Sequence, residues 1–565
     1  MTRLLLCFFV TLIACSGKPG GSRSSTNWSA AEITALFDTL PAPRLEVATE
    51  ISNNWTVSFP GFPDMRKANV TLPHSVSLPD SEIIYENDLD VPVPGALAVH
   101  ADDGAQVFID GVQIRNREGT LFQIDKPGRV RVRIRVLNNA MSGGLKKVTF
   151  SSAGQTEKFD ADQRRYKRLS ILTKQSELSS VGDSARNLIA DALLNPDDSM
   201  KLHVAEASVV NSPWIVGPVV VFRDSSSARI TVIREGPGNT ILNWGTDSLR
   251  LDNEITCRED VCSFEIPVSG LEEKTIYYQI RAGRTVRNIQ AFDVPHAPER
   301  FSFSIWADSQ SGWTTFETHM RNSLKYNDAF SAGVGDLVGN GASASEWVRL
   351  FEILSISAQK RPVFLVPGNH DYDGYYDELV PKNFFRFTQY RQNYFSWQYG
   401  NAAFIALDPN ERFPIGVPSQ SAQYRWLLQE LENKSWKDAT WRFVLVHQPP
   451  YSQGWQGYHG EVVLRGLLEP LIEKHKIDFV VSGHTHDFER LTMQYGKQQV
   501  TYLVVGGGGG GLEPHASSDE PKMDKVIKLH HITRIRVGQD TISVHVHDLE
   551  DKIIDSLIIM KPRTP

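Results

Sequence analysis

The sequence predicts a multidomain protein in which β-rich segments and a helical connector precede a C-terminal α/β domain. Its 565 residues are too many for one ordinary hydrophobic core. Apolar residues alternate with arginines from position 129 to 136, as in a half-buried strand. Beyond Phe301, short apolar runs alternate with segments of helical periodicity, which is typical of an α/β fold.

Composition excludes several classes of protein. The chain is 41% hydrophobic and 22% charged, which is typical of a soluble globular protein, and no late segment is apolar for long enough to span a bilayer. The formal charge of -7 is small for this length, so no global field would attract nucleic acid or anionic lipid. We therefore expect any anion-binding site to be local and no nucleic-acid partner.

Residues 1–15 have the pattern of a targeting signal. Arg3 precedes an apolar run that ends at Ile13, and Ala14 and Cys15 follow. The residues up to Cys15 (Leu-Ile-Ala-Cys) resemble the lipobox of bacterial lipoproteins, which implies a lipid anchor at Cys15 and a flexible tether over residues 16–30. Ordinary signal cleavage is the alternative. We expect an exported protein in the bacterial periplasm, or on the outer membrane or cell surface, whose only membrane attachment is this anchor.

Segment 31–152 is predicted to be a jelly-roll-like β-sandwich. Asp110-Gly111 lies between two apolar runs, which is a strong hairpin signal. The arginines between positions 129 and 135 occupy every second residue, so they are expected on the solvated face of a strand rather than in a basic patch. The segment resembles the galactose-binding-like jelly rolls that accompany many extracellular enzymes.

A helical connector is predicted over residues 153–205, and a second β-sandwich over residues 206–296, where the run from Thr275 resembles a fibronectin-type strand. Cys257 and Cys262 are the only cysteines beyond the signal. Two cysteines cannot complete a structural zinc site. Because export permits disulfides, we expect a small loop closed by a disulfide, with free buried thiols as the alternative.

The C-terminal domain is assigned to residues 297–562. Its predicted helices include residues 347–354 and 464–471, whose apolar residues are spaced three or four apart. Its predicted strands are Phe301 to Ala307, Ala329 to Val334, Val363 to Val366, Ala403 to Leu407, Phe443 to Val446, Phe479 to Val481 and Tyr502 to Val505.

Five of these strands end in a short polar motif. Ligands bind beyond the carboxyl ends of strands in such folds, so these motifs are expected to meet. Asp, Asn, Gln and His supply the oxygen and nitrogen atoms that first-row divalent metals accept, whereas any one of them alone would be structural. The motifs are Asp308-Ser309-Gln310, Gly335-Asp336, Gly368-Asn369-His370-Asp371, His447 and Gly483-His484-Thr485-His486.

The order of these motifs resembles the calcineurin-like metallophosphoesterase superfamily, and the residues around His447 resemble its purple acid phosphatase branch. The resemblance covers Phe301 to Ile559 and implies two packed β-sheets flanked by helices, with two divalent metal ions (Mn, Zn or Fe) between the motifs. The implied ligands are Asp308, Gln310 and His486 for the first ion, Asn369, His447 and His484 for the second, and Asp336 as a bridge.

Two positions depart from the family pattern. Gln310 stands where most members have histidine, so the first site is expected to bind metal less tightly. Purple acid phosphatases have a tyrosine three residues after the aspartate, and here that residue is Gly339. We therefore expect a colourless protein without a ferric-tyrosinate pair.

The resemblance implies attack on phosphorus by a hydroxide that bridges the two ions. His370 is the candidate proton donor to the leaving group, with Asp371 orienting its ring; a turn-capping role for Asp371 is the alternative. His459 is a second candidate donor, and an exposed loop position is its alternative. Asp408 is expected to be only a strand-end cap.

The six glycines from Gly506 to Gly511 could suggest a phosphate-binding loop. No Gly-Lys-Ser/Thr follows them, so that hypothesis is rejected. We expect a close-packed turn near the metal site instead.

The predicted function is that of an exported, metal-dependent phosphoric ester hydrolase, similar to acid phosphatases, which acts on small phosphomonoesters. A phosphodiesterase or nucleotide hydrolase is one alternative, because the same metal pair serves both reactions. A surface-binding lipoprotein with an inert phosphoesterase domain is the other.

Overall fold

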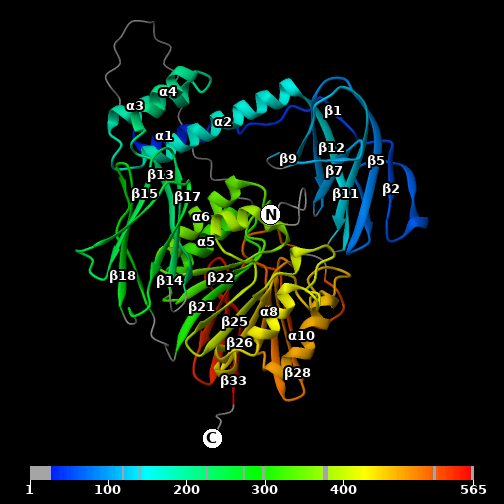
Figure 1. The fold of residues 1–565 in the computed structure, drawn as a ribbon, viewed down its shortest axis with the longest axis vertical. Helices are drawn as coiled ribbons and strands as arrows, with labels where there is room; N and C mark the ends of the chain where they lie inside the picture. The colour runs from blue at the N-terminus through cyan, green and yellow to red at the C-terminus, as the bar shows by residue number, and fades with distance from the viewer. Residues whose placement is uncertain are drawn as a thin grey trace, which may run out of the picture.

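The computed structural model describes residues 27–561 except positions 103, 118–119, 139–140, 224–226, 272–273, 295–299, 373–379 and 513–516. The predicted signal, Cys15 and most of the tether lie outside the described residues. The protein is multidomain and rich in β-sheet (Figure 1). In the part of the chain that is described, no helix is both long and apolar enough to cross a membrane.

The first β-rich part consists of two sheets that share one hydrophobic core. One sheet contains β1 (Thr49–Glu50), β12 (Ser142–Ser152), β6 (Gly95–Ala101), β10 (Leu121–Ile124) and β9 (Asn116–Arg117) in this order, with β4 (His74–Ser77) paired to β12. The other contains β3 (Lys67–Val70), β2 (Trp55–Ser58), β5 (Ser81–Val91), β11 (Gly128–Asn138), β7 (Ala105–Ile109) and β8 (Val112–Ile114). A short 3-10 helix, η1 (Pro63–Met65), precedes β3.

Local sequence explains two features of this part. Asp110 and Gly111 both have positive φ (51° and 84°) and form the turn between β7 and β8, which confirms the predicted hairpin. On β11 the apolar residues are buried, while three of the four arginines form ion pairs with acidic residues of the neighbouring strand β5, such as Arg131 with Glu86 at 3.1 Å. The arginines therefore belong to a solvated strand face, as predicted.

Three helices connect the two β-rich parts, and a fourth, which precedes the first β-rich part, packs with them. The connecting helices are α2 (Ala153–Ser176), α3 (Asp183–Leu194) and α4 (Ser199–Val209), and the fourth is α1 (Ala30–Phe37). Ser152 and Gln155 form a capping box that begins α2, which spans the gap between the β-rich parts (Figure 1). Helix α1 falls within the segment predicted as a sandwich, but its Ile33 is buried in the same core as α2, α3 and α4.

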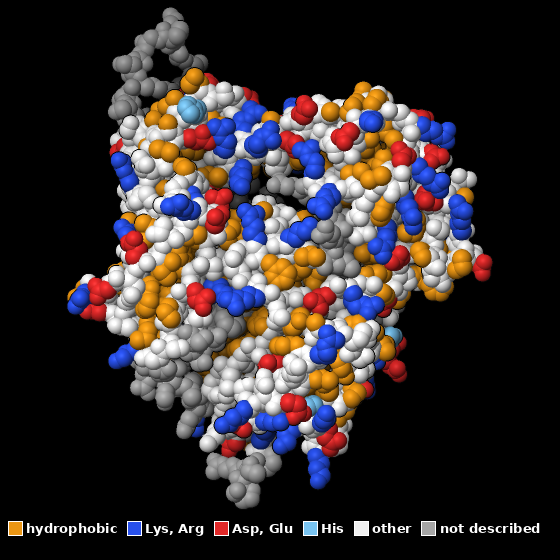
Figure 2. Space-filling model, viewed as in Figure 1, with side chains coloured by type: hydrophobic (Ala, Val, Ile, Leu, Met, Phe, Trp, Pro, Cys, Tyr) orange, Lys and Arg blue, Asp and Glu red, His pale blue; other side chains and the backbone are white. Residues whose placement is uncertain are grey.

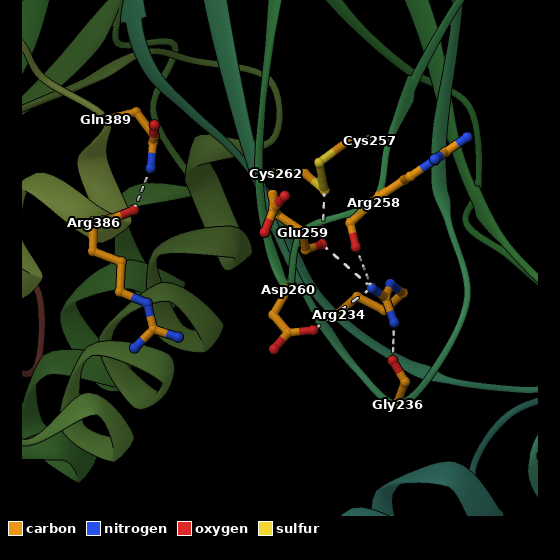
Figure 3. Close-up of a disulfide and its surroundings, with 9 residues drawn as sticks. All are labelled: Arg234, Gly236, Cys257, Arg258, Glu259, Asp260, Cys262, Arg386 and Gln389. Carbon is orange, nitrogen blue, oxygen red and sulfur yellow. Dashed lines mark hydrogen bonds and ion pairs between the residues drawn. A yellow bond between two sulfur atoms is a disulfide. The ribbon is translucent and has the colours of Figure 1, made fainter.

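The second β-rich part also has two sheets around one core. One contains β13 (Trp214–Arg223), β14 (Ser227–Glu235) and β17 (Val261–Pro267); the other contains β16 (Asn253–Cys257), β15 (Thr240–Gly245), β18 (Thr275–Ala282) and β19 (Thr285–Val286), with β20 (Gln290–Asp293) paired to β18. A disulfide joins Cys257 to Cys262, as predicted (Figure 3). Beside it, the buried Arg234 guanidinium donates to the carbonyls of Arg258 and Glu259.

The C-terminal part is an α/β domain of two packed mixed sheets, and a large aromatic core fills the space between them. The first sheet contains β23 (Val363–Val366), β22 (Phe330–Val334), β21 (Phe301–Trp306), β31 (Ile532–Val537), β32 (Thr541–His547) and β33 (Ile553–Met560). The second contains β24 (Phe395–Tyr399), β25 (Ala402–Leu407), β26 (Trp441–Val446), β27 (Phe479–Ser482), β29 (Gln498–Val505), β28 (Phe488–Tyr495) and β30 (Lys525–Ile527).

Helices cover the outer faces of both sheets, and separate apolar clusters hold them there. They are α5 (Trp313–Ser323), α6 (Ala344–Ala358), α7 (Lys382–Thr388), α8 (Ala422–Glu430), α9 (Lys434–Asp438) and α10 (Val462–His475), with two 3-10 turns, η2 (Asn369–Asp371) and η3 (Pro409–Glu411). Every predicted strand and both predicted helices of this domain are present. Figure 2 shows Lys and Arg side chains interspersed with Asp and Glu over the face in view.

Candidate metal centre

The predicted metal ligands follow the carboxyl ends of five strands, taken from both sheets of the C-terminal domain. Strands β21, β22 and β23 are parallel to one another, as are β26 and β27, so their carboxyl ends meet along one edge of the two-layer core. Asp308, Asp336 and His484 have positive φ values of 58°, 49° and 72°, which is uncommon for residues other than glycine. Such backbone conformations concentrate at functional sites.

Glycines in the motifs permit a close approach between the motif residues. A Cβ atom added to Gly335 would lie 2.3 Å from Nδ1 of His447, and one added to Gly368 would lie 2.2 Å from Oδ1 of Asp336. A Cβ on Gly483 would lie 2.5 Å from Oδ2 of Asp308. A side chain at any of these glycines would collide with a side chain of another motif. This explains why three of the motifs begin with glycine.

The side chains of the candidate ligands form one cluster. Nε2 of His447 lies 3.2 Å from Oδ1 of Asp336 and 4.0 Å from Oδ1 of Asp308, while Nε2 of His486 lies 3.6 Å from the same oxygen of Asp308. The amide nitrogen of Gln310 lies 2.9 Å from Nε2 of His486. Asp336, His447 and His484 each offer a ligand atom within 4.8 Å of the other two.

Several ligand atoms in this cluster are buried without a hydrogen-bond partner. They are Oδ1 of Asp308, Nε2 of His447 and Nε2 of His484. Burying an unpaired polar atom costs about 1–3 kcal/mol, so three such atoms in one cluster of carboxylates and imidazoles favour a bound ligand that would compensate them. A set of carboxylate oxygens and imidazole nitrogens without thiolates fits first-row divalent metal ions.

Charge within the cluster shifts several pKa values. Burial and the negative charge of Asp336 raise the pKa of Asp308 well above its ordinary value, although His447 opposes the shift. Burial would lower the pKa of His447, but the neighbouring carboxylates Asp336 and Asp308 outweigh burial and raise it to about 10. Burial lowers the pKa of His484 to about 3. Without metal, the cluster therefore holds a proton on His447 that a metal ion must displace.

Asn369 is buried beside this cluster, at the start of the turn η2. Gln448 lies next to it, with its Nε2 3.4 Å from Oδ1 of Asn369. The backbone N–H of the following residue, His370, donates to Oδ1 of Asp336 at 2.9 Å. Asn369 is thus tied to the motif that contains Asp336.

The contacts of Asp371 favour the alternative to the predicted dyad with His370. Asp371 accepts hydrogen bonds from the backbone N–H groups of Gly368, Leu337 and Val338, at 2.7, 2.9 and 3.2 Å, so it caps two turns, which was the alternative. The ring of His370 is held through Nδ1 by the carbonyl of Gly339, at 3.0 Å. Its Nε2 lies 3.9 Å from Oδ2 of Asp336, and about a third of the side chain is exposed.

His459 is exposed and lines a cavity of about 480 Å³. Its Nδ1 is paired with the carbonyl of Glu520. The rings of Trp455 and Tyr458 contact His484 instead, at centroid distances of 5.0 and 5.9 Å. The geometry supports the exposed-loop alternative for His459. Sequence reasoning missed both aromatic residues, because loop aromatics carry no distinguishing spacing.

The first β-rich part contacts the C-terminal domain beside the cavity that His459 lines. The wall of the same cavity includes Asp80 and Met141, which belong to that part. Leu137, at the end of β11, packs on Tyr372 and Phe413 of the C-terminal domain in a small apolar cluster. Tyr372 directly follows Asp371, so the contact lies next to one of the metal-ligand motifs.

The glycine run from Gly506 to Gly511 follows β29 and passes close to the ligands. A Cβ on Gly506 would lie 1.9 Å from the carbonyl oxygen of Thr485, and one on Gly508 would lie 2.3 Å from that of Ala307. The run is a close-packed turn, as predicted, and it lies beside the candidate ligands.

Comparison with known proteins shows which family and which proteins this region is similar to. The sequence profile of the family described as calcineurin-like phosphoesterase matches residues 301–488. The chain is 26% identical over 257 residues to purple acid phosphatase 18 of Arabidopsis thaliana, covering 43% of this chain and 56% of the relative. It is also 26% identical over 253 residues to Fe(3+)-Zn(2+) purple acid phosphatase 12 of the same plant, covering 41% of this chain and 52% of the relative.

The solved structures agree at the level of the fold. A purple acid phosphatase isolated from yellow lupin (Lupinus luteus) seeds superposes with a TM-score of 0.52, covering 86% of this chain and 93% of that structure at 12% identity. In sequence, the chain spans little more than half the length of these curated relatives. Residues 301–488 form a calcineurin-like phosphoesterase domain whose homologues are purple acid phosphatases.

Proposed function

We propose that the protein is a dinuclear-metal phosphatase that hydrolyses small phosphomonoesters. The observation that carries the proposal is the buried cluster of carboxylates and imidazoles, whose unpartnered atoms Oδ1 of Asp308, Nε2 of His447 and Nε2 of His484 lie at one edge of the two sheets. The purple acid phosphatases among its relatives support a monoester substrate.

Seven residues would hold the two ions. Asp308, Gln310 and His486 would bind the first, and Asn369, His447 and His484 would bind the second, with Asp336 between them. Oδ1 of Asp336 lies 3.2 Å from Nε2 of His447, and its Oδ2 lies 3.5 Å from Nε2 of Gln310. Asp336 therefore stands among proposed ligands of both ions, which supports this division. Two bound dications would neutralise phosphate charge and lower the pKa of a water molecule to near neutrality.

His370 would supply the proton to the leaving group. The carbonyl of Gly339 fixes the hydrogen of the neutral ring on Nδ1, so the proton that is exchanged resides on Nε2, on the side of Asp336. The partial exposure of His370 lets its ring reach both a substrate and solvent. Replacing His370 with Ala should lower turnover and leave metal content unchanged; loss of metal would instead make His370 part of the metal site.

A substrate panel on purified protein tests the function. The protein is loaded with Mn²⁺ or Zn²⁺ and assayed with p-nitrophenyl phosphate, bis(p-nitrophenyl) phosphate and nucleotides, while metal content is measured by mass spectrometry. We expect two metal ions per chain and the highest kcat/KM with the monoester. Preference for the bis ester would establish a phosphodiesterase, and two bound ions without turnover on any substrate would favour a binding protein.

We also propose that the protein is exported and lipid-anchored through Cys15. The sequence before Cys15 supports this, and the Cys257–Cys262 disulfide is typical of proteins from oxidising compartments. Expression in a bacterial host with labelled palmitate should give a membrane-bound, labelled protein, and Cys15→Ala should abolish the label. A soluble, unlabelled wild-type protein would contradict the anchor.

The two N-terminal β-rich parts would be accessory domains, the first a jelly-roll-like β-sandwich and the second a fibronectin-like one. In support, each part has two antiparallel sheets around a core of its own. Limited proteolysis should cut between these parts before it cuts within them. Cleavage first within the strands would contradict the division.

A further inference from the structure

Asp408 directly follows β25, and this position predicts no more than a strand-end cap. It does cap the turn η3, accepting from the backbone N–H of Asn410 at 2.9 Å. Its carboxylate is fully buried and accepts three further hydrogen bonds: from Nδ2 of Asn410 at 2.9 Å, the hydroxyl of Tyr372 at 2.8 Å and Nδ2 of Asn393 at 2.8 Å. A simple cap needs only the first of these bonds.

A chain of amides leads from this carboxylate to a metal ligand. Asn410 donates through Nδ2 to Asp408, and its Oδ1 accepts from Nε2 of Gln448 at 2.6 Å. The same nitrogen of Gln448 lies 3.4 Å from Oδ1 of Asn369. Asp408, Asn410, Gln448 and Asn369 are all at least 97% buried, so water does not compete for these bonds.

The order of donors and acceptors along this row of amides follows from the chemistry of Asp408, its first member. Burial raises the pKa of Asp408 to about 6, while its hydrogen bonds oppose the shift, so the group is ionised at neutral pH and can only accept. Asn410 must therefore present its NH2 group to Asp408 and its oxygen to Gln448. Gln448 must then present its NH2 group toward Asn369. The group of Asn369 that faces Gln448 must therefore be an acceptor, which is its amide oxygen.

We propose that Asp408 is a positioning residue that sets the amide orientation of Asn369 through Asn410 and Gln448, so that Asn369 offers oxygen to the second metal ion. An amide nitrogen carries no lone pair for a metal ion, so a flipped Asn369 would be lost as a ligand. This inference rests on the proposed dinuclear function, since the second ion is the one that Asn369 would bind.

The test compares two variants that disturb the order of donors and acceptors in this row of amides with one variant that preserves it. Asp408→Asn keeps the shape of the side chain but can donate as well as accept, and Asn410→Ala removes the middle link. Tyr372→Phe is the matched control, because it deletes one donor to Asp408 and leaves the order of the amides intact. Circular dichroism establishes which variants fold, and isothermal titration with Zn²⁺ measures the affinity of each equivalent.

We expect Asp408→Asn and Asn410→Ala to weaken the second equivalent of Zn²⁺ by about 10- to 100-fold and leave the first nearly unchanged, as is typical for residues that orient a metal ligand. Turnover of p-nitrophenyl phosphate should recover as Zn²⁺ is raised, which a general folding defect would not allow. Tyr372→Phe should bind both equivalents like the wild type.

Wild-type affinity for both equivalents in a folded Asp408→Asn protein would overturn the inference. If that variant does not fold, wild-type affinity in Asn410→Ala would do the same. Equal weakening in Tyr372→Phe would also overturn it, because the effect would then come from lost hydrogen bonds and not from amide direction. Failure of the wild type to bind two ions would instead contradict the proposed function.

Discussion

The two ends of strand β22 carry buried carboxylates in opposite environments. Before the strand, Asp328 accepts from Nε and Nη2 of Arg534, at 2.6 to 3.2 Å, and from the hydroxyl of Ser302 at 2.7 Å. After it, Asp336 accepts from the backbone N–H of His370 at 2.9 Å and from Nε2 of Gln310 at 3.5 Å, and no arginine or lysine among the described residues pairs with it; Nε2 of His447, which has no hydrogen-bond partner there, lies 3.2 Å away. Both carboxylates are at least 96% buried.

The difference separates a structural charge from a functional one. Buried charges are stable when they are paired and hydrogen-bonded, which describes Asp328 and Arg534. The cluster around Asp336 retains unpartnered atoms, a condition that folding alone does not favour. The carboxyl end of the strand therefore carries the proposed metal site, which we call its functional end, and the amino end serves stability.

The largest expected effect is on metal and turnover when Asp336 becomes Asn. Removing the bridging charge should empty both metal sites and lower kcat/KM for p-nitrophenyl phosphate by more than about 100-fold, because even residues that only orient a ligand cost 10- to 100-fold. Metal analysis and kinetics measure both changes. Asp328→Asn is the control and should keep its metal in the folded fraction. Two ions retained by Asp336→Asn would contradict the bridging role.

The second effect is on stability when Arg534 becomes Met. Asp328 would remain buried without its cation, which should lower the free energy of unfolding by about 3–5 kcal/mol. Urea denaturation of the C-terminal domain measures the loss, and metal content of the folded protein should not change. A loss below about 1 kcal/mol would mean that Asp328 is not dependent on Arg534.

The third effect is a pH dependence of the free energy of unfolding in the metal-free protein, caused by His447 beside Asp336. The pKa of His447 is raised from 6.5 to about 10, so between these values the folded state holds a proton that the unfolded state has released. Its stabilising contribution is therefore complete below about pH 6.5 and lost as pH rises toward 10. With chelator present, the free energy of unfolding should fall between pH 7 and 10, on the order of a few kcal/mol.

His447→Gln is the control for this prediction, since it removes the titrating group. Its free energy of unfolding should vary less over the same range, as measured by urea denaturation at fixed ionic strength. Equal slopes for the two proteins would show that other groups carry the dependence. Metal affinity should change in the opposite direction and rise with pH, because the metal ion must displace this proton.

Much of the fold and of the candidate site could be predicted from the sequence. Polar motifs directly after apolar runs indicated the carboxyl ends of strands, and those strands meet because the sheet is parallel there. The hairpin at Asp110-Gly111 and the close packing of the glycines after Val505 also followed from residue chemistry. These features depend on local spacing, which the sequence displays directly.

Other features depend on contacts between distant segments. Asp328 and Arg534 are 206 residues apart, and neither lies in a motif, so nothing in the sequence pairs them. Asp371 was assigned to His370 because they are adjacent, yet its carboxylate turns to the backbone of Leu337 and Val338. Asp408 was interpreted from its strand end alone, which could not indicate Tyr372 or Asn393 as partners.

The smallest expected effect lies outside the C-terminal domain, at the Cys257–Cys262 disulfide. It closes a loop with a sequence separation of 5, so loop-closure entropy predicts a contribution of roughly 2 kcal/mol to the second β-rich part. The double variant Cys257→Ser/Cys262→Ser should lower the free energy of unfolding of that part by about this amount. Metal content and kcat/KM should stay at wild-type values, because the loop packs around Arg234 and not around the metal cluster. Loss of metal in this variant would mean that the second β-rich part supports the candidate metal site. Structural support for that site would then not be confined to the C-terminal domain.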